Sequence, residues 1–300
     1  MSVRTLYDVP APAKLNLFLL VVGRRADGYH LLQSPCVLID WADRMHFELR
    51  PDGRLARHDL GPTLPAEDLC LRAARALQAA AGTTMGVDIS IDKQVPWGAG
   101  MGGGSSDAAS TLLALNRLWG LSWPRQRLAE IGLRLGADVP FFIGGHNAFV
   151  EGIGERLTPI TLPRAWYAVL KPAAAIATRA IYEHPHLVRN TETVILCGSF
   201  DEAQGRNSWL PGHEGFGKND LQIPAENCCP EVAQAARWLE ARFGNSRMTG
   251  SGSAVFARAG TGESPRATFS AQELTQELTQ NRVARMCRSL AEHPLRGWAG

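Results

Sequence analysis

The sequence predicts a mixed chain of helices and strands organised in two domains. Its 300 residues, 45% of them hydrophobic, are enough for one large or two ordinary cores. Strand-like and helix-like segments follow one another along most of the chain. A loop over residues 158–164 separates two groups of these segments, so we expect the domain boundary there.

The first elements predict a β-hairpin. Residues 15–22 and 31–39 are strand-like apolar runs, and residues 23–28 join them through Asp27-Gly28, a strong hairpin signal. Tyr29 and His30 are therefore expected at the start of the returning strand.

Two helices and a strand follow, and a third helix comes after them. Residues 67–81 form an alanine-rich helical segment, and residues 87–91 alternate apolar and polar side chains as a half-buried strand does. A helix from residue 105 is expected to end before Gly120. Residues 124–135 predict another, with Pro124 at its first position and Gly136 after its end.

The second half alternates strands with helices. Residues 148–151, 166–170 and 254–257 predict short strands, and residues 230–243 predict a helix. Residues 198–218 are rich in glycine, asparagine, serine and charge, which predicts a long surface loop. A four-residue duplication at 272–279 predicts a short helical stretch and no repeat architecture.

The most informative segment lies between the strand at 87–91 and the helix from 105. Five glycines occupy seven positions at residues 98–104, and Ser105, Ser106 and Asp107 follow as expected N-cap residues. Glycine allows positive φ and close backbone approach, and a helix N-terminus attracts anions. The segment therefore predicts a phosphate-binding loop.

Two other glycine-loop types fit less well. Gly98, Gly100 and Gly103 satisfy G-x-G-x-x-G, but no acidic residue ends a second strand about 20 positions on. A Walker A loop needs Gly-Lys-Ser/Thr, and Gly104 is followed directly by Ser105. A ligand-free turn is disfavoured because six loop and cap positions in succession are unusual without an anion.

Composition argues against several other functions. The net charge is +2 and the basic residues are scattered, so nothing indicates a nucleic-acid partner. The apolar run at residues 17–22 is too short to span a membrane, and we expect a cytoplasmic protein. No C-x-x-C occurs, which predicts reduced and mostly buried thiols at Cys36, Cys70, Cys197, Cys228, Cys229 and Cys287.

Three further segments are candidates for chemistry. Lys14 and Asn16 share one face of the first strand, which suits a phosphate or a polar substrate, although a solvated edge strand fits equally well. Asp138 follows a helix and precedes apolar residues, where a carboxylate is costly unless it is used or caps a turn. Residues 248–256 form a second glycine-rich turn, which an ordinary tight turn would also explain.

Together these segments resemble the GHMP kinase superfamily, with its lysine-bearing first strand, central glycine loop ending in Ser-Ser and C-terminal glycine-rich turn. Within it, the chain is similar to the family of 4-diphosphocytidyl-2-C-methylerythritol kinases over residues 10–257. The matching segments are Pro-Ala-Lys-Leu-Asn-Leu at 12–17, Arg-Ala-Asp-Gly-Tyr-His at 25–30, Gly-Gly-Gly-Ser-Ser-Asp-Ala at 102–108, Gly-Ala-Asp-Val-Pro-Phe at 136–141, Asn-Asp-Leu at 219–221 and Thr-Gly-Ser-Gly at 249–252.

The resemblance implies an α+β fold with an N-terminal ATP-binding domain over residues 1–160 and a C-terminal, ferredoxin-like substrate domain over residues 161–300. It also implies ATP-dependent phosphorylation of the 2-hydroxyl of a cytidine diphosphate-linked methylerythritol, a small-molecule substrate, in the non-mevalonate route to isoprenoid precursors. Neither nucleic acid nor membrane is expected as a partner, and the chain is expected to be a monomer or a weak homodimer.

The resemblance also assigns roles to single residues. Asp138 would accept or orient the hydroxyl proton, and Lys14 would stabilise developing charge and keep Asp138 ionised. Mg²⁺ would accompany ATP, with Ser105 or Ser106 as its candidate ligand. The substrate would be bound by Asn16, Tyr29, His30, Thr178 and Tyr182, with the two tyrosines stacking on cytosine. ATP would be bound by Lys93, Pro96, Gly98, Ala99, Gly100, Met101, Gly102, Gly103, Gly104, Ser105 and Ser106.

Some positions depart from the family pattern. Asp68 stands where asparagine is expected near the adenine, Ala99 and Met101 replace glycine and leucine, residues 197–218 are enlarged, and the match fades after Gly260. Two alternatives stay open: a GHMP-type kinase for another small alcohol, and a nucleotide-binding regulator without catalysis. Against the regulator stand Lys14 and Asp138, because a binding protein has no need of both.

Overall fold

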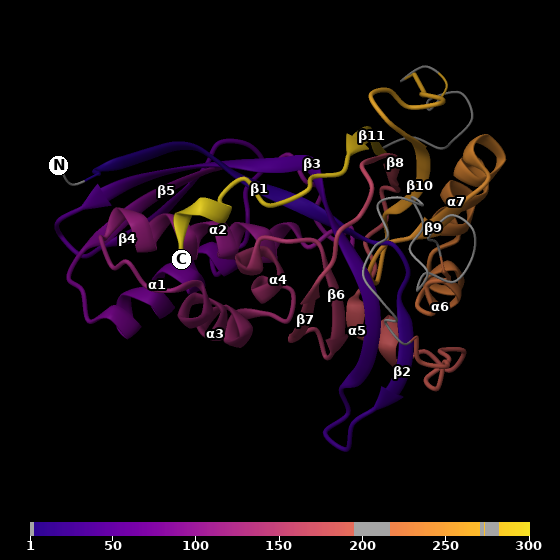
Figure 1. Cartoon of the computed structure of the whole chain (residues 1–300), viewed down its shortest axis with the longest axis horizontal. Coiled ribbons are helices and arrows are strands. Elements are labelled where there is room, and N and C mark those ends of the chain that lie inside the picture. The colour runs from indigo at the N-terminus through magenta and orange to yellow at the C-terminus, as the bar shows by residue number, and fades with distance from the viewer. Residues whose placement is uncertain (1–2, 195–216, 271–272, 274–281) are drawn as a thin grey trace.

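The computed structural model describes residues 3–194, 217–270, 273 and 282–300, and within them the chain builds two sheets that pack together (Figure 1). The larger sheet has the order β4 (Leu55–Asp59), β5 (Gly86–Asp92), β3 (His30–Arg50), β6 (Ala148–Gly152) and β7 (Arg156–Pro159). Two more strands, β1 (Thr5–Asn16) and β2 (Leu20–Arg24), pair with β3. The long strand β3 therefore joins the hairpin to the centre of the sheet.

Four helices cover one side of this sheet: α1 (Leu69–Ala81), α2 (Gly103–Leu118), α3 (Arg125–Leu135) and α4 (Val139–Gly144) (Figure 1). Helix α2 is central to this layer because twelve of its sixteen residues are buried. Its apolar side chains share one core with Met45, Phe47 and Ile89 of the sheet. Burial on nearly every side makes α2 a fixed platform for the loop that precedes it.

The smaller sheet has the antiparallel order β11 (Val283–Arg288), β8 (Ala165–Lys171), β10 (Val255–Thr261) and β9 (Ser246–Met248). The helices α5 (Thr178–Glu183), α6 (Gln222–Cys228) and α7 (Pro230–Phe243) belong to this half. The two faces of the smaller sheet pack against different partners. One face shares a core with α7, and the other meets Leu15, Val37 and Ile39 of the larger sheet through Val169 and Phe256.

The C-terminal residues pack against the core that α2 shares with the larger sheet. The short helix η1 (Arg296–Trp298) lies over α2, and Leu295 is buried among the α2 and α3 side chains. Arg125 at the start of α3 donates to the carbonyl oxygens of Arg296 and Ala299. The stretch after Gly260 thus contributes β11 to the smaller sheet and anchors the C-terminal residues on the helices of the larger one.

The predicted elements are confirmed with shifted limits. The run at 15–22 is divided between β1 and β2, the hairpin turns as expected, and β3 continues to Arg50. The N-cap prediction for Ser105, Ser106 and Asp107 is wrong, because α2 starts at Gly103 with Gly102 as N-cap at φ +70°. Glycine reaches this conformation without strain, so the helix begins earlier.

Several elements had no counterpart in the sequence pattern: β4, β7, β9, β11, α4, α5 and α6. All are short, and short apolar runs do not show a clear period. Pro124 precedes α3 instead of starting it. The expected loop at 198–218 and the duplication at 272–279 lie almost entirely outside the described residues.

Among the cysteines that the structure describes, Cys36, Cys70, Cys229 and Cys287 are buried thiols and Cys228 is exposed. No helix of the described ranges combines the length and apolar character that crossing a membrane requires.

Candidate functional site

Strand β1 delivers Lys14 and Asn16 to a buried position. Their exposed fractions are 4% and 5%, so the alternative of a solvated edge strand is wrong. Lys14 Nζ donates to Asn16 Oδ1 at 2.6 Å, and Asn16 Nδ2 donates to Ser34 Oγ at 2.7 Å. The ammonium group is therefore held in one orientation by an amide that is itself held by β3.

Asp138 stands opposite this pair. Its Oδ2 lies 3.5 Å from Lys14 Nζ, and its side chain is 42% exposed although that of the lysine is only 5% exposed. Asp138 precedes α4 but makes no capping hydrogen bond with that helix. The turn-cap alternative therefore has no support, and the carboxylate is left free to face a ligand.

The glycine-rich loop is shaped by positive φ angles. Gly98, Gly100 and Gly102 have φ of +63°, +71° and +70°. A Cβ on Gly100 would collide with the carbonyl oxygen of Thr249, and one on Gly102 would lie 2.9 Å from the Phe142 ring. Glycine is therefore required at these two positions by space as well as by backbone conformation.

Backbone hydrogen bonds tie this loop to the other two candidate segments. Lys14 N donates to Met101 O at 3.0 Å, and Ala254 N donates to Ala99 O at 3.1 Å. Thr249 Oγ1 accepts from Asn16 N at 3.0 Å. Segments that are about 85 and 150 residues apart in the chain thus form one hydrogen-bonded unit, which the sequence alone could only suggest.

Asn219 holds the second glycine-rich turn through two hydrogen bonds. Its Nδ2 donates to Met248 O at 2.8 Å and to Gly250 O at 2.9 Å. The neighbouring carboxylate of Asp220 accepts from Val21 N at 2.8 Å and from Thr191 Oγ1 at 2.7 Å. The Asn-Asp-Leu segment at 219–221 therefore holds the backbone of the turn and of β2 in place and exposes no reactive group.

Lys93 has a different role from the other predicted ligands. Its ammonium group bridges two buried carboxylates, Asp43 and Asp107, with 2.6 Å to Asp107 Oδ2. Burial acts to lower its pKa, but the carboxylates outweigh burial and raise the pKa to about 12. Asp43 also accepts from Gln94 N and Val95 N. This network fixes the start of the loop to α2.

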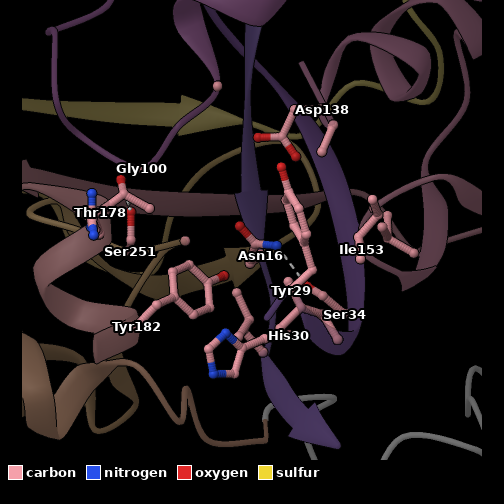
Figure 2. Close-up of a pocket in the computed structure, with 18 of the residues that line it drawn as sticks. Asn16, Tyr29, His30, Ser34, Gly100, Asp138, Ile153, Thr178, Tyr182 and Ser251 are labelled. Atoms are coloured by element: carbon pink, nitrogen blue, oxygen red, sulfur yellow. Dashed lines mark hydrogen bonds between the residues drawn. The ribbon is translucent and has the colours of Figure 1, made fainter. Parts of the chain in front are cut away.

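A cavity of about 1040 Å³ runs from the glycine-rich loop to the β2–β3 hairpin (Figure 2). Of the predicted site residues, those that line it are Lys14, Asn16, Tyr29, His30, Gly98, Gly100, Gly102, Ser105, Asp138, Thr178 and Tyr182. The other predicted site residues do not line this cavity: Lys93, Pro96, Ala99, Met101, Gly103, Gly104 and Ser106. Ala99 and Met101 point into the core, which leaves only their backbone for a ligand.

We call the part of the cavity at Lys14, Gly100 and Asp138 the loop end, and the part at His30 and Tyr182 the hairpin end. At the hairpin end the two rings stack with centroids 4.9 Å apart and planes at 26°. Tyr29 is 61% exposed, and Figure 2 shows its hydroxyl turned towards Asp138. The two tyrosines therefore border one cavity, but in the free protein Tyr182 stacks on His30.

The loop end can accommodate a magnesium ion. Ser106 Oγ is buried and has no hydrogen-bond partner among the described residues, and Ser105 lines the cavity. No group of three or more histidine, cysteine or acidic side chains in the described ranges is arranged so that it could hold a metal ion. Mg²⁺ does not need one, because it commonly takes one or two protein ligands together with substrate phosphates and water.

Sequence reasoning missed several cavity residues. Arg24, Arg179 and Arg189 line the hairpin end with the carboxylates of Asp27 and Glu183. Arg24 belongs to the hairpin signal, so its place could have been inferred, but nothing in the pattern marks Arg189. Asp68, which departs from the family, caps α1 by accepting from Leu71 N and also pairs with Arg57.

Comparisons with known proteins agree with this arrangement. The GHMP kinases N terminal domain matches residues 68–146, and the GHMP kinases C terminal model matches residues 201–289. A 4-diphosphocytidyl-2-C-methyl-D-erythritol kinase from Methylibium petroleiphilum is 62% identical over all of both chains. One from Paracidovorax citrulli is 54% identical over 99% of this chain and 98% of its own.

Solved structures extend the likeness. A crystal structure of a 4-(cytidine 5'-diphospho)-2C-methyl-D-erythritol kinase is 35% identical with a TM-score of 0.71, covering 93% of this chain and 98% of its own. Homoserine kinase from Cytophaga hutchinsonii has a TM-score of 0.65 at 15% identity, covering 98% and 96%, and shares the fold.

Proposed function

Because the chain belongs to the 4-diphosphocytidyl-2-C-methyl-D-erythritol kinase family of GHMP kinases, we propose that it transfers the terminal phosphoryl group of ATP to the 2-hydroxyl of 4-diphosphocytidyl-2-C-methyl-D-erythritol. One observation carries the chemistry: Lys14 Nζ lies 3.5 Å from Asp138 beside the glycine-rich loop. The full-length identity to curated relatives does not favour a kinase for another alcohol or a regulator without catalysis.

The loop end supplies the groups that phosphoryl transfer needs. This reaction depends chiefly on positioning and on neutralising charge. When bound, ATP with Mg²⁺ would supply the phosphoryl group and part of the neutralising charge, and Ser105 or Ser106 would hold the ion. The loop at Gly98 to Ser106 presents backbone N–H groups and the start of α2 to the phosphates.

Asp138 is the group that we propose takes the proton of the substrate hydroxyl. The Lys14 ammonium group lies 3.5 Å from this carboxylate, and Asn16 fixes the lysine in place. Lys14 also faces the side on which negative charge develops during transfer. The two residues act as one unit, with Asp138 as base and Lys14 as the stabilising cation.

The hairpin end is proposed to hold the cytidine part. Tyr29, His30 and Tyr182 offer ring faces and a hydrogen-bonding edge there, and Asn16 and Thr178 are proposed to bind the methylerythritol unit. Thr178 Oγ1 lies 2.9 Å from Ser251 Oγ of the second glycine-rich turn. We propose a cytoplasmic enzyme that acts as a monomer or weak homodimer.

Phosphorus NMR tests this function directly. ATP, Mg²⁺ and the cytidyl substrate are incubated with the protein, and a new phosphomonoester resonance is expected together with ADP. Mevalonate and free methylerythritol serve as acceptor controls and should give no such signal. ATP turnover with mevalonate but not with the cytidyl substrate would overturn the assignment, and no transfer to any acceptor would favour the regulator.

A further inference from the structure

Arg189 makes a set of contacts at the hairpin end that the proposed mechanism does not use. Its Nη1 donates to Leu187 O at 3.0 Å, and its Nη2 donates to Tyr182 O at 2.9 Å and to His184 O at 3.1 Å. Its Nε donates to His30 Nε2 at 3.2 Å. Three backbone carbonyls thus hold the guanidinium group in place against the imidazole.

The fourth contact decides the state of His30. A guanidinium group has five N–H donors, no acceptor and a permanent positive charge. His30 Nε2 must therefore accept, and a neutral imidazole that accepts at one nitrogen carries its proton on the other. In Figure 2 the ring of His30 lies below Tyr182, with one nitrogen turned towards the cavity and the other away from it. The stack on Tyr182 fixes the plane of the ring.

We propose that Arg189 is a positioning residue that holds His30 as the neutral tautomer protonated on Nδ1, so that the cavity faces a hydrogen-bond donor. Such a donor suits the ring nitrogen or carbonyl oxygen of cytosine, both of which are acceptors. This inference rests on the proposed function for the identity of the base. The tautomer itself follows from the free protein alone.

The surroundings of His30 also favour its neutral form. Burial lowers the pKa of His30, and the charges of Arg189 and of Arg24 on β2 lower it further. Tyr182 faces the ring from α5, and the carboxylates of Asp27 and Glu183 line the same cavity. His30 thus stays neutral at neutral pH, and a neutral ring has a definite tautomer for Arg189 to select.

Nitrogen NMR of histidine-labelled protein without substrate tests the tautomer. In the wild type at pH 7.5 the His30 proton is expected on Nδ1, and in Arg189→Met a population with the proton on Nε2 should appear. Arg24→Met is the matched control, because it removes a nearby positive charge without removing a hydrogen bond to the ring. A wild-type proton on Nε2, or the same tautomer in Arg189→Met, would overturn the proposal.

Kinetics test the consequence. Arg189→Met should raise KM for the cytidyl substrate about 3- to 10-fold, the value of one hydrogen bond, with KM for ATP unchanged. In a His30→Asn background the amide offers a donor and has no tautomer, so Arg189→Met should add little. An equal rise of KM in both backgrounds would show that Arg189 acts only by holding the backbone of residues 182–187. Compared with Arg189→Met, Arg189→Lys should restore part of the lost affinity.

The NMR experiment can fail or succeed independently of the proposed function. If the chain phosphorylates a different alcohol, the kinetic comparison changes, but the NMR result in the free protein is unaffected. If the tautomer is wrong and the cytidyl substrate still reacts, only the role of Arg189 is lost.

Discussion

The two ends of the cavity are built in different ways. At the loop end, backbone hydrogen bonds join β1, the glycine-rich loop and the second glycine-rich turn, and the lysine is almost fully buried. At the hairpin end, side chains on a hairpin and a six-residue helix form the wall, and Tyr29 is largely exposed. The loop end is therefore expected to govern turnover and the hairpin end to govern substrate affinity.

The largest expected effect is at Asp138. Asp138→Asn keeps the shape of the side chain and removes its charge, and turnover should fall about 10²–10⁴-fold with little change in either KM. Lys14→Met should also reduce turnover strongly, and the double variant should be little worse than the poorer single one. Steady-state kinetics of the four proteins checks this. Near-normal turnover of Asp138→Asn would remove its role as base, and additive losses would separate the two residues.

Gly100 and Gly98 test the backbone construction of the loop end. Both have positive φ, but a Cβ on Gly100 collides with Thr249 O whereas one on Gly98 meets only Ala175 at 3.4 Å. Gly98→Ala should lower the free energy of unfolding by about 1 kcal/mol through backbone strain, and Gly100→Ala by about 1–3 kcal/mol more through overpacking. Denaturant and thermal unfolding of the two variants measure both losses. Equal losses would show that the junction between the two turns is not tight.

Tyr182 tests the hairpin end. Tyr182→Ala should weaken binding of the cytidyl substrate by about 1–3 kcal/mol through lost stacking and leave ATP affinity unchanged. Tyr182→Phe keeps the ring and should bind nearly as the wild type does. Titration calorimetry with each ligand separates the two cases. If binding of ATP and of the cytidyl substrate weakened together in Tyr182→Ala, the ring would be a packing element of the core that the smaller sheet shares with α7.

The smallest expected effect is a pH dependence of KM for the cytidyl substrate, which arises at the hairpin end only. The pKa of His30 is lowered by burial and by two arginines, so the ring is neutral at neutral pH and takes up a proton only on acidification. Protonation gives Nε2 a hydrogen that points at the Arg189 donor. KM for the cytidyl substrate should therefore rise as pH falls through this lowered pKa, with KM for ATP unaffected. A matching rise in both constants would assign the effect to another group.

The sequence determined the local parts of this protein. Glycine spacing, alternating apolar residues and Asp27-Gly28 are readable one segment at a time, because backbone freedom and side-chain period act over a few residues. The hairpin, the longer helices and the place of the glycine-rich loop between a strand and a helix were predicted correctly for this reason. Lys14 and Asn16 were also placed on one face of a strand, although nothing local showed that this face is buried.

Only the tertiary structure decided which parts meet. The contact of Asp138 with Lys14, the bridge from Lys93 to Asp43 and Asp107, and the hydrogen bond from Arg189 to His30 each join residues far apart in the chain. Such pairs depend on how two sheets pack, and packing is set by the summed burial of many side chains. The same reason explains α4 and β9, which are too short for a period of their own and are held by the core around them.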